Sequence, residues 1–412
     1  MIKRLQTPIL KKWLKKFALV VIIGARQVGK TTLVRKLLKT SRKYFTFDDA
    51  ATVLSAASSP EAFLLQAPQV TVDEAQKVAD IFPSIKKLID EKRVPGQFVI
   101  TGSANLPLLP KINESLAGRA AYVEMYPLTI WESLQRTAAL PKLVKLVKQT
   151  SGRRAWNFLL KEKPTTIPLP KLICRGGLPN AWLENDDAAR QAWFKSYVTT
   201  YLEKDIRDLS QIKNLHEFRK FLALSAFRSG QILSKSDLAR DAGISYTTAC
   251  HFFNLLLATF QIFTVEPYFQ NIGKRLTKAP KLMWNDTGLA IHLQGLTSFA
   301  DLERLGRTGH LLENRIAIEL KTLLEIYLPS AKLFYWRTSA GAEIDFVIEH
   351  KSQLIPIEVK WAEKINRHEI KSLENFLQDF PATAPWGVVL YRGRSLLKVK
   401  ENLFLIPLEL VL

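Results

Sequence analysis

The residues best placed to do chemistry form the segment GARQVGKTT, which directly follows the apolar run Ala18–Ile23. The segment fits the phosphate-binding pattern G-x-x-x-x-G-K-[ST] at every position. Its glycines let backbone N–H groups turn toward phosphate oxygens, and the helix expected from Lys30 adds its positive end. We expect Lys30 to reach the β- and γ-phosphates of ATP and the Thr31 hydroxyl to bind Mg²⁺. The predicted nucleotide-binding residues are Gly24, Ala25, Arg26, Gln27, Val28, Gly29, Lys30, Thr31 and Thr32.

An acidic motif follows at the end of the expected strand Val70–Val72, in the sequence QVTVDEAQ. A magnesium-bound triphosphate needs a carboxylate placed opposite the phosphate-binding loop. Asp73 is predicted to hold Mg²⁺ through water, and Glu74 to orient and activate the attacking water. Two adjacent acids can also be a solvated strand end, but their position after the loop favours the catalytic interpretation.

The next expected strand, Phe98–Thr101, ends in QFVITGSAN, a cluster of small hydroxyl and amide groups. A polar side chain here would lie beside the γ-phosphate and could hold the attacking water. Thr101, Ser103 and Asn105 are the candidates, and the sequence does not choose among them; Ser103 is grouped with the predicted catalytic residues. The alternative is an ordinary Gly-Ser turn.

A cation must offset the charge that builds on the γ-phosphate, often an arginine from the same or a neighbouring subunit. Arg119, in ESLAGRA, is assigned this role, with a structural salt bridge as the alternative. Action on a neighbouring subunit would require an oligomer. Arg26 lies inside the loop and could touch phosphate directly.

A second group of acids lies near the end of the chain, in GAEIDFVIEHKSQLIPIEVKW. Asp345 falls on one expected strand, and Glu358 and Lys360 share a face of the next because strand side chains alternate. Glu313 falls on a preceding helix. Carboxylates gathered in this way can bind a divalent metal, and a lysine can stabilise a scissile phosphate. The pattern resembles the D…ExK core of restriction endonucleases, except that Ile344 replaces the proline that often precedes the first acid. A fold that only binds nucleic acid or a partner is the alternative.

The middle of the chain contains SKSDLARDAGISYTTACHFFNLLLATFQI, which predicts a helix-turn-helix with its turn at Gly243 and Ser245 as helix cap. The second helix would bury Ala249, Phe253 and Leu256. Its outer face would present four polar residues, and a basic tract after it would contact phosphates. The outer residues are Tyr246, Thr247, His251 and Asn254, and the basic ones are Lys274, Arg275, Lys278 and Lys281. Packing between domains is the alternative use of such a module.

The order of apolar strands and helical stretches predicts an α/β protein that begins with a parallel sheet flanked by helices. Strands are expected at 18–23, 44–47, 70–72, 98–101 and 121–125. We expect a P-loop ATPase domain over 1–134, a basic helical linker over 135–171, a helical region with a winged-helix-like segment over 172–280 and a nuclease-like α/β domain over 281–412.

The composition indicates which classes of partner and which compartment to expect. The 412 residues carry a net charge of +21, which favours nucleic acid first and acidic membrane surface second. The two cysteines cannot form a disulfide framework and fit a reducing compartment. No apolar run approaches the roughly 20 residues of a membrane span, so we expect a cytoplasmic protein without stable membrane insertion.

Several motifs together resemble one family. GARQVGKTT, VDEAQ, VITGSAN and SLAGRA followed by YPLT are similar to the ATPase domain of prokaryotic AAA+ type ATPases that carry a C-terminal domain of unknown function. RGGLPNAW and YLEKDIRDL resemble the start of their second half. The resemblance implies ATP binding and hydrolysis on a sheet of AAA+ strand order, followed by a winged-helix segment and a restriction-endonuclease-like fold. We therefore expect an ATPase that uses ATP and Mg²⁺ and couples turnover to a DNA or protein partner. The alternatives are an ATP-switched DNA-binding regulator and a protein-interaction module with a non-catalytic nuclease-like fold.

Overall fold

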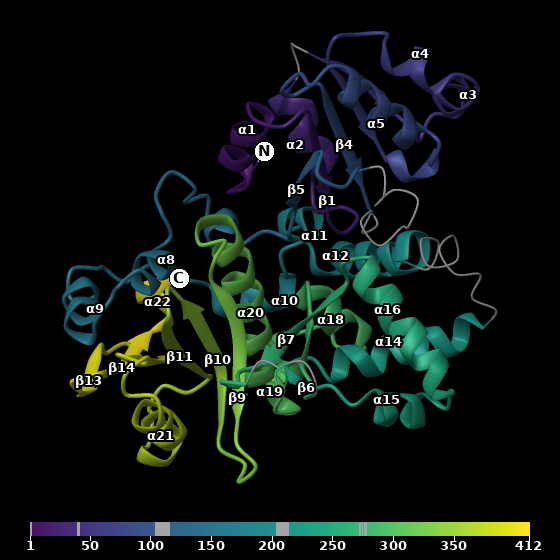
Figure 1. The fold of residues 1–412 in the computed structure, drawn as a ribbon. Coiled ribbons are helices and arrows are strands. Elements are labelled where there is room, and N and C mark those ends of the chain that lie inside the picture. The colour runs from purple at the N-terminus through teal and green to yellow at the C-terminus, as the bar shows by residue number, and fades with distance from the viewer. Residues whose placement is uncertain are drawn as a thin grey trace.

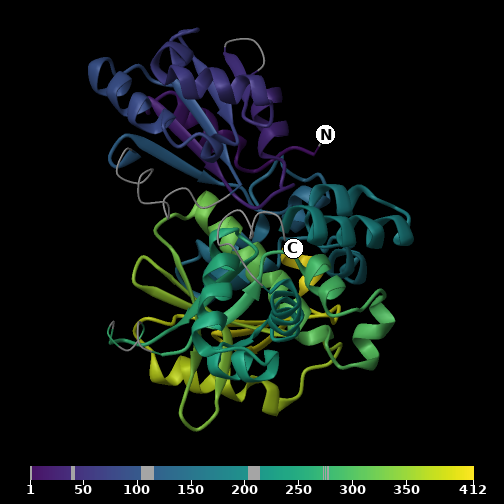
Figure 2. The same cartoon turned by 90° about the vertical axis from the view of Figure 1, so that its right-hand side faces the viewer.

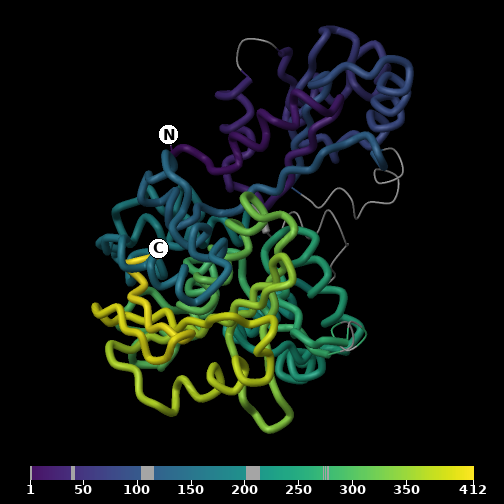
Figure 3. The backbone as a smooth tube through the Cα atoms, turned by 60° about the vertical axis from the view of Figure 1, so that its left-hand side comes forward, coloured from purple at the N-terminus to yellow at the C-terminus, as the bar shows by residue number. Residues whose placement is uncertain are grey.

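The computed structural model describes residues 2–38, 42–103, 116–202, 214–271, 273, 275 and 278–412. Two bodies are visible in perpendicular views (Figure 1 and Figure 2): a smaller one built from the N-terminal residues, and a larger one built from the rest. The tube view in Figure 3 shows the N-terminus beside the segment that leads from one body to the other.

The smaller body contains a five-stranded sheet in the order β2-β3-β4-β1-β5, in which every neighbouring pair is parallel. All residues of β1 and β4 are buried, as in parallel sheets covered on both faces. The five strands agree with the predicted ones within two residues. They are β1 (Leu19–Ile23), β2 (Lys43–Thr46), β3 (Val70–Asp73), β4 (Phe98–Gly102) and β5 (Ala120–Glu124).

Helices pack around this sheet. The leading helix α1 has buried Leu10 among exposed lysines, so its apolar face packs inward as expected. The helices are α1 (Thr7–Leu14), α2 (Lys30–Leu37), α3 (Ala50–Ser58), α4 (Pro60–Leu64) and α5 (Ile81–Glu91), with a 3-10 turn η1 (Ala75–Lys77).

A run of short helices follows β5 and packs mainly against helices of the larger body. They are α7 (Ile130–Ser133), α8 (Lys142–Val147), α9 (Gly152–Leu159), α10 (Leu169–Arg175), α11 (Pro179–Leu183) and α12 (Asp187–Ser196), followed by a π-helical segment η3 (Tyr197–Leu202). Pro179 begins α11, where its missing N–H costs no helical hydrogen bond.

The predicted helix-turn-helix is present. Helix α15 (Lys235–Ala242) ends at Gly243, whose φ of 74° favours glycine, and Ser245 caps α16 (Tyr246–Ala258) through the N–H of Thr248. Ala249 and Leu256 of α16 are fully buried, as predicted. Helix α14 (Leu215–Phe227) and strand β6 (Gln231–Ile232) precede the motif, and β7 (Ile262–Pro267) and β8 (Lys281–Trp284) follow it as an antiparallel pair.

The larger body contains a mixed nine-stranded sheet in the order β13-β14-β12-β11-β10-β9-β7-β8-β6. Strand β7 pairs in parallel with β9, so the strands around the helix-turn-helix and those near the C-terminus form one sheet. Sequence reasoning did not foresee this pairing, because its partners are far apart along the chain. The remaining strands are β9 (Lys332–Arg337), β10 (Glu343–His350), β11 (Gln353–Lys360), β12 (Gly387–Tyr391), β13 (Leu397–Lys400) and β14 (Leu403–Pro407). The helices of this part are α18 (Thr287–Leu293), α19 (Phe299–Arg304), α20 (Thr308–Tyr327), η4 (Arg367–Ile370), α21 (Lys371–Asp379) and α22 (Leu408–Val411).

The long helix α20 joins the two bodies. The Glu319 carboxylate accepts a hydrogen bond of 2.7 Å from the N–H of Ile130, and Arg315 donates one of 2.9 Å to the Leu128 carbonyl. Further along α20, Lys321 donates to the Tyr126 hydroxyl at 2.6 Å. The segment after β5 is therefore held by one buried helix of the larger body. Among the described residues, no helix is long and apolar enough to cross a membrane.

Candidate functional site

The phosphate-binding loop lies where β1 passes into α2, as its sequence predicted. Gly24 has a φ of 140°, and a Cβ atom on it would lie 2.2 Å from the Met125 carbonyl oxygen. Gly29 caps α2 with a φ of 98°. Both positions therefore need glycine. The buried Lys30 ammonium donates hydrogen bonds to the carbonyls of Gly24 at 2.8 Å and Ala25 at 2.9 Å, which fixes its side chain across the loop.

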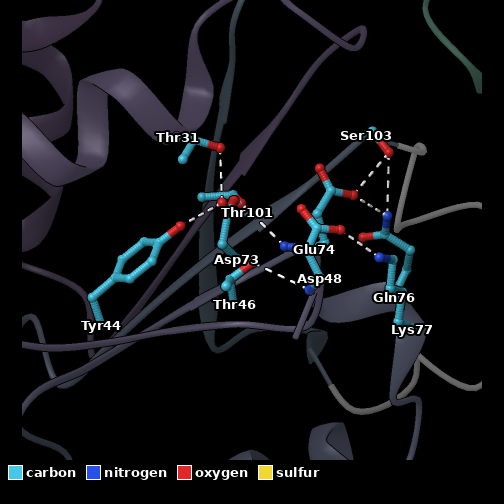
Figure 4. Close-up of polar contacts among 10 residues, drawn as sticks. All are labelled: Thr31, Tyr44, Thr46, Asp48, Asp73, Glu74, Gln76, Lys77, Thr101 and Ser103. Atoms are coloured by element: carbon cyan, nitrogen blue, oxygen red, sulfur yellow. Dashed lines mark hydrogen bonds and ion pairs between the residues drawn. The ribbon is translucent and has the colours of Figure 1, made fainter. Parts of the chain in front are cut away.

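Asp73 is the centre of a hydrogen-bond network at the end of β3 (Figure 4). Its Oδ2 accepts from the Thr31 hydroxyl at 2.8 Å and from the Tyr44 hydroxyl at 2.6 Å. Its Oδ1 accepts from the Thr101 hydroxyl. Burial, followed by the Asp73 carboxylate, raises the pKa of the Tyr44 phenol. The sequence predicted that Asp73 and Thr31 would meet, but it gave no signal for Tyr44.

Glu74 follows in an unusual backbone conformation. Its φ of 56° and ψ of 44° are left-handed, a region that non-glycine residues occupy at a cost in free energy. One carboxylate oxygen accepts from the Ser103 hydroxyl at 3.0 Å and from the Gln76 amide at 2.5 Å. The hydroxyl of Thr101, on β4, accepts a hydrogen bond of 3.4 Å from the Glu74 N–H. Of the three sensor candidates, Ser103 touches the Glu74 side chain, Thr101 touches Asp73, and Asn105 lies outside the described residues.

A cavity of about 330 Å³ opens over the loop. Six of the residues predicted to bind the nucleotide line it, together with Glu74. Asp48, which is ion-paired with Lys77, also lines it. Pro179 and Asn180 of α11 complete the lining from the larger body. Asn180 donates a hydrogen bond of 2.9 Å to the Gln27 side chain. Sequence reasoning missed these two residues, whose only signal was the motif RGGLPNAW.

Arg119 lies away from this cavity. It immediately precedes β5, whose first residue Ala120 is paired with Leu19, whereas the P-loop follows the other end of β1. The guanidinium forms two hydrogen bonds of 2.7 Å to Asp90. Within its own chain, Arg119 therefore forms a salt bridge with Asp90, which was the alternative to a catalytic role. From this position it could contact a nucleotide bound to a neighbouring subunit, but not one bound to its own P-loop.

The second group of predicted residues also comes together, on α20, β10 and β11. The N–H of Val359 donates to Asp345 Oδ2 at 2.8 Å, the N–H of Asp345 donates to Glu358 at 3.3 Å, and Lys360 donates to Glu358 at 2.6 Å. Glu313 and Glu358 are each only 7% exposed. Burial, then the Asp345 charge, raises the pKa of both carboxyls to about 8.

A buried lysine pairs with the acids on the α20 and β10 side of this cluster. Lys281 Nζ lies 2.8 Å from Glu313, 2.6 Å from Glu343 and 3.7 Å from Asp345. Burial alone would lower the pKa of Lys281, but these three carboxylates raise it overall. Within the described part of the chain, no group of three or more His, Cys, Asp or Glu side chains is arranged to hold a metal ion. The residues present therefore fit an internal ammonium better than a divalent cation.

This placement corrects the expectation for the basic tract. Lys281 is 1% exposed and ion-paired, so the prediction that it contacts phosphate is wrong. Arg275 is paired with Glu349 and lies over the rings of Tyr268 and Phe334. Lys278 is exposed, and Lys274 lies outside the described residues. Two of the four basic residues predicted to contact phosphate, Arg275 and Lys281, are therefore ion-paired within the protein.

Comparison with known proteins agrees with the N-terminal geometry. The chain matches the model of an AAA domain over residues 16–134, a domain of unknown function (DUF8612) over 168–300 and another (DUF4143) over 308–411. Among solved structures, the Walker-type ATPase PABY2304 of Pyrococcus abyssi aligns with a TM-score of 0.44 at 15% identity, covering 70% of this chain and 94% of that one. A single-residue variant of RuvB from Thermotoga maritima aligns with a TM-score of 0.25 at 14% identity, covering 64% and 89%.

Two curated relatives are closer in sequence. The uncharacterized proteins Rv2008c of Mycobacterium tuberculosis and Mb2031c of Mycobacterium bovis are each 31% identical over 353 residues, which cover 85% of this chain and 72% of the relative. The AAA domain implies nucleotide binding, for which Mg²⁺ is the general companion ion. The chain belongs to the family of Rv2008c and Mb2031c, and it combines an AAA domain of the P-loop ATPase type with two domains of unknown function.

Proposed function

We propose that this protein binds Mg·ATP over the loop Gly24–Thr32 and hydrolyses it. The observation that carries the proposal is the position of Glu74. Its carboxylate lines the same cavity as Lys30 and Thr31, and Ser103 and Gln76 fix its orientation. A positioned carboxylate beside the γ-phosphate can accept a proton from attacking water, which distinguishes hydrolysis from binding alone.

The donor set fits magnesium. The Thr31 hydroxyl and the Asp73 carboxylate are hard oxygen ligands already 2.8 Å apart, and they would hold the ion directly or through water. When bound, Mg²⁺ would neutralise charge on the β- and γ-phosphates. Lys30 would exchange its two loop carbonyls for phosphate oxygens, because a charged acceptor binds an ammonium more strongly than a carbonyl does.

The experiment compares two variants. Lys30→Ala should lose ATP binding and turnover, whereas Glu74→Gln should keep ATP binding and lose about 10²–10⁴-fold in kcat. Turnover is measured as phosphate release, and binding by calorimetric titration with Mg·ATP. Normal hydrolysis by Lys30→Ala would overturn the assignment.

We further propose that turnover is coupled to a macromolecular partner through the larger body. Helix α20 supports a coupling route, since it contacts the segment after β5 and also carries Glu313. The order α14-β6-α15-α16-β7-β8 supports a winged-helix module, and the exposed face of α16 is free to bind. ATP turnover measured with and without duplex DNA separates the partners, because stimulation indicates DNA and indifference favours a protein.

The proposal does not extend to DNA cleavage. The α20, β10 and β11 elements with Asp345, Glu358 and Lys360 support a restriction-endonuclease-like fold. However, the Lys281 ammonium lies 2.8 Å from Glu313 and 3.7 Å from Asp345, so a buried cation of the protein already pairs with two of the carboxylates that would bind a metal ion. We therefore propose that this half is a non-catalytic binding module.

A further inference from the structure

The positive charge of this protein is concentrated in two segments of the chain. Residues 1–47 contain 13 Lys and Arg and no Asp or Glu, and residues 135–171 contain 9 Lys and Arg and one acid, Glu162. The other 328 residues contain 37 Lys and Arg and 37 Asp and Glu, so their formal charge is zero. The two segments therefore carry the whole net charge of +21.

Many of these bases are exposed and lack an acidic partner. The acid of the second segment, Glu162, lies 3.5 Å from the partly buried Lys142 and leaves the exposed bases unpaired. Among the described residues, no ion pair joins the exposed bases of α1, α8 and α9, or of the turns that follow these helices, to an acid. These exposed bases are Lys11, Lys12, Lys15, Lys16, Lys148, Arg153, Arg154, Lys161 and Lys163.

The two basic segments meet in space. Lys3 and Pro8 of the first segment, Lys36 of α2 and Thr137 of the second segment line a cavity of about 360 Å³. Lys3 and Lys36 are exposed. The views in Figure 1 and Figure 3 both place α1, α8 and α9 on the same side of the molecule. We call the surface formed by Lys3, Lys36 and the nine exposed bases of α1, α8 and α9 the basic face.

The apolar side of α1 is not available to a membrane. Leu10 is fully buried, and Trp13 packs edge to face on Phe17 with ring centroids 5.4 Å apart. An amphipathic helix binds a membrane by burying its apolar side among the lipids. Because the apolar side of α1 is already packed inside the protein, α1 offers a partner only its ammonium groups, which bind phosphate as point charges.

The rings near these bases are also used within the fold. Trp156 of α9 packs on Phe404 with centroids 5.4 Å apart, and no aromatic side chain described in α1, α8 or α9 is largely exposed. Proteins that bind single strands stack the bases on exposed rings. A duplex presents regularly spaced phosphates on its outside and needs only cations to bind them. The basic face therefore fits a duplex better than a single strand.

The helix-turn-helix cannot supply this attraction. Residues 235–258 contain two bases and two acids, and α16 contains no Lys or Arg. Arg240 of α15 is ion-paired with Asp237 and Asp241. Attraction to a phosphate backbone must therefore come from another surface of the protein.

We propose that the basic face binds the phosphate backbone of a nucleic-acid duplex, without reading its sequence. The inference deepens the proposed function, because it names the class of partner and the surface that holds it. It does not require ATP hydrolysis, since the lysines of α1 do not line the cavity over the P-loop.

The test measures binding of the full chain to fluorescently labelled duplexes of DNA and of RNA, each about 30 base pairs long, by anisotropy over a salt titration. The variant replaces the four lysines of α1 and its C-terminal turn together: Lys11→Gln, Lys12→Gln, Lys15→Gln and Lys16→Gln. We expect duplex affinity to fall about tenfold or more. The slope of log K against log salt should become shallower by about 2 to 4, because each lost phosphate contact removes about 0.9. Glutamine is a good helix former, so α1 should still fold.

The matched control removes the same charge from exposed lysines outside the two basic segments. It should bind duplex within about twofold of wild type, because its lysines lie away from the basic face. The four substitutions are Lys195→Gln, Lys332→Gln, Lys364→Gln and Lys371→Gln.

Four results would overturn the inference. They are a wild-type protein that binds neither duplex, an α1 variant that binds as wild type, an equal loss in the control, and wild-type binding to phosphatidylserine vesicles but not to duplexes. Binding of either duplex supports it, and the tighter one identifies the nucleic acid.

ATP turnover without duplex separates this inference from the proposed function. The α1 variant should hydrolyse ATP as wild type does, so a failure to bind duplex would leave the ATP site in place. Conversely, a wild-type protein that binds duplex but does not hydrolyse ATP would overturn the proposed hydrolysis and leave the basic face in place.

Discussion

Thr31 Oγ1 donates a hydrogen bond of 2.8 Å to Asp73 Oδ2, and so ties the first turn of α2 to the end of β3. The two residues are 42 positions apart, and they meet because β3 and β1 are both parallel strands that end at the same edge of the sheet. Asp73 is thus held beside the P-loop by a contact within the protein.

Asp73→Asn should impair magnesium-dependent turnover. The amide keeps the size of the side chain but removes the charge that would favour Mg²⁺, so we expect a loss of about 10²-fold in kcat and a raised magnesium requirement. Phosphate release measured over a Mg²⁺ titration checks this. Asp80→Asn, at an exposed acid before α5, serves as the control and should behave as wild type.

Ser103→Ala tests whether the orientation of Glu74 matters. Removing the hydroxyl leaves Glu74 with its Gln76 contact alone, so we expect kcat to fall about tenfold while KM stays within twofold. An increase in KM at unchanged kcat would instead mean that Ser103 serves ground-state binding. Ser58→Ala, on exposed α3, is the control.

Arg119 can act on ATP only from a neighbouring subunit, since within its own chain it pairs with Asp90. We expect Arg119→Ala to lose turnover but retain ATP binding, and mixing it with Lys30→Ala protein to restore part of the turnover. In a mixed assembly, the intact P-loop of an Arg119→Ala subunit can face the intact Arg119 of a Lys30→Ala subunit. Asp90→Asn is the control that releases the arginine without removing it, and wild-type turnover by Arg119→Ala would reject the catalytic role.

Lys281→Met should strongly destabilise the larger body. The substitution leaves the buried carboxylates around Lys281 without their counter-ion, and losing one partner of a buried ion pair costs about 3–5 kcal/mol. Chemical denaturation monitored by tryptophan fluorescence measures the change. Lys398→Met, which removes a partly exposed pair with Glu401, should cost less than about 1 kcal/mol.

Glu319 makes stability depend on pH at the junction of the two bodies. Burial raises its pKa to about 7, above the ordinary value of 4.5, so between these values the folded protein keeps a proton that the unfolded chain has lost. The contribution of protonated Glu319 to the free energy of unfolding is complete below pH 4.5 and is lost as the pH rises to 7.

Thermal unfolding at pH 5 and pH 8 tests the effect. Glu319→Gln keeps an acceptor for the Ile130 N–H but cannot ionise, so wild type should lose roughly 1 kcal/mol per pH unit relative to this variant across the window. Glu401→Gln, at a largely exposed side chain, should show the same dependence of stability on pH as wild type. Parallel pH profiles for wild type and Glu319→Gln would contradict the prediction.

The sequence by itself determined the local parts of this protein. Glycine spacing, the strand before it and the acids at the end of β3 predicted the P-loop and singled out Asp73 and Glu74, because backbone conformation and strand periodicity act over a few residues. For the same reason the five strands of the first sheet and the helix-turn-helix around Gly243 could be predicted.

Only the tertiary structure decided which charges remain free and which residues share a cavity. Lys281 looked like a phosphate contact in a basic tract, yet the β7–β8 pairing places it among the acids of α20 and β10. Asn180 reaches the P-loop because the motif before α11 is anchored on Asp286. Such contacts join residues from 32 to 153 positions apart, and they depend on how distant elements pack, which no local pattern encodes.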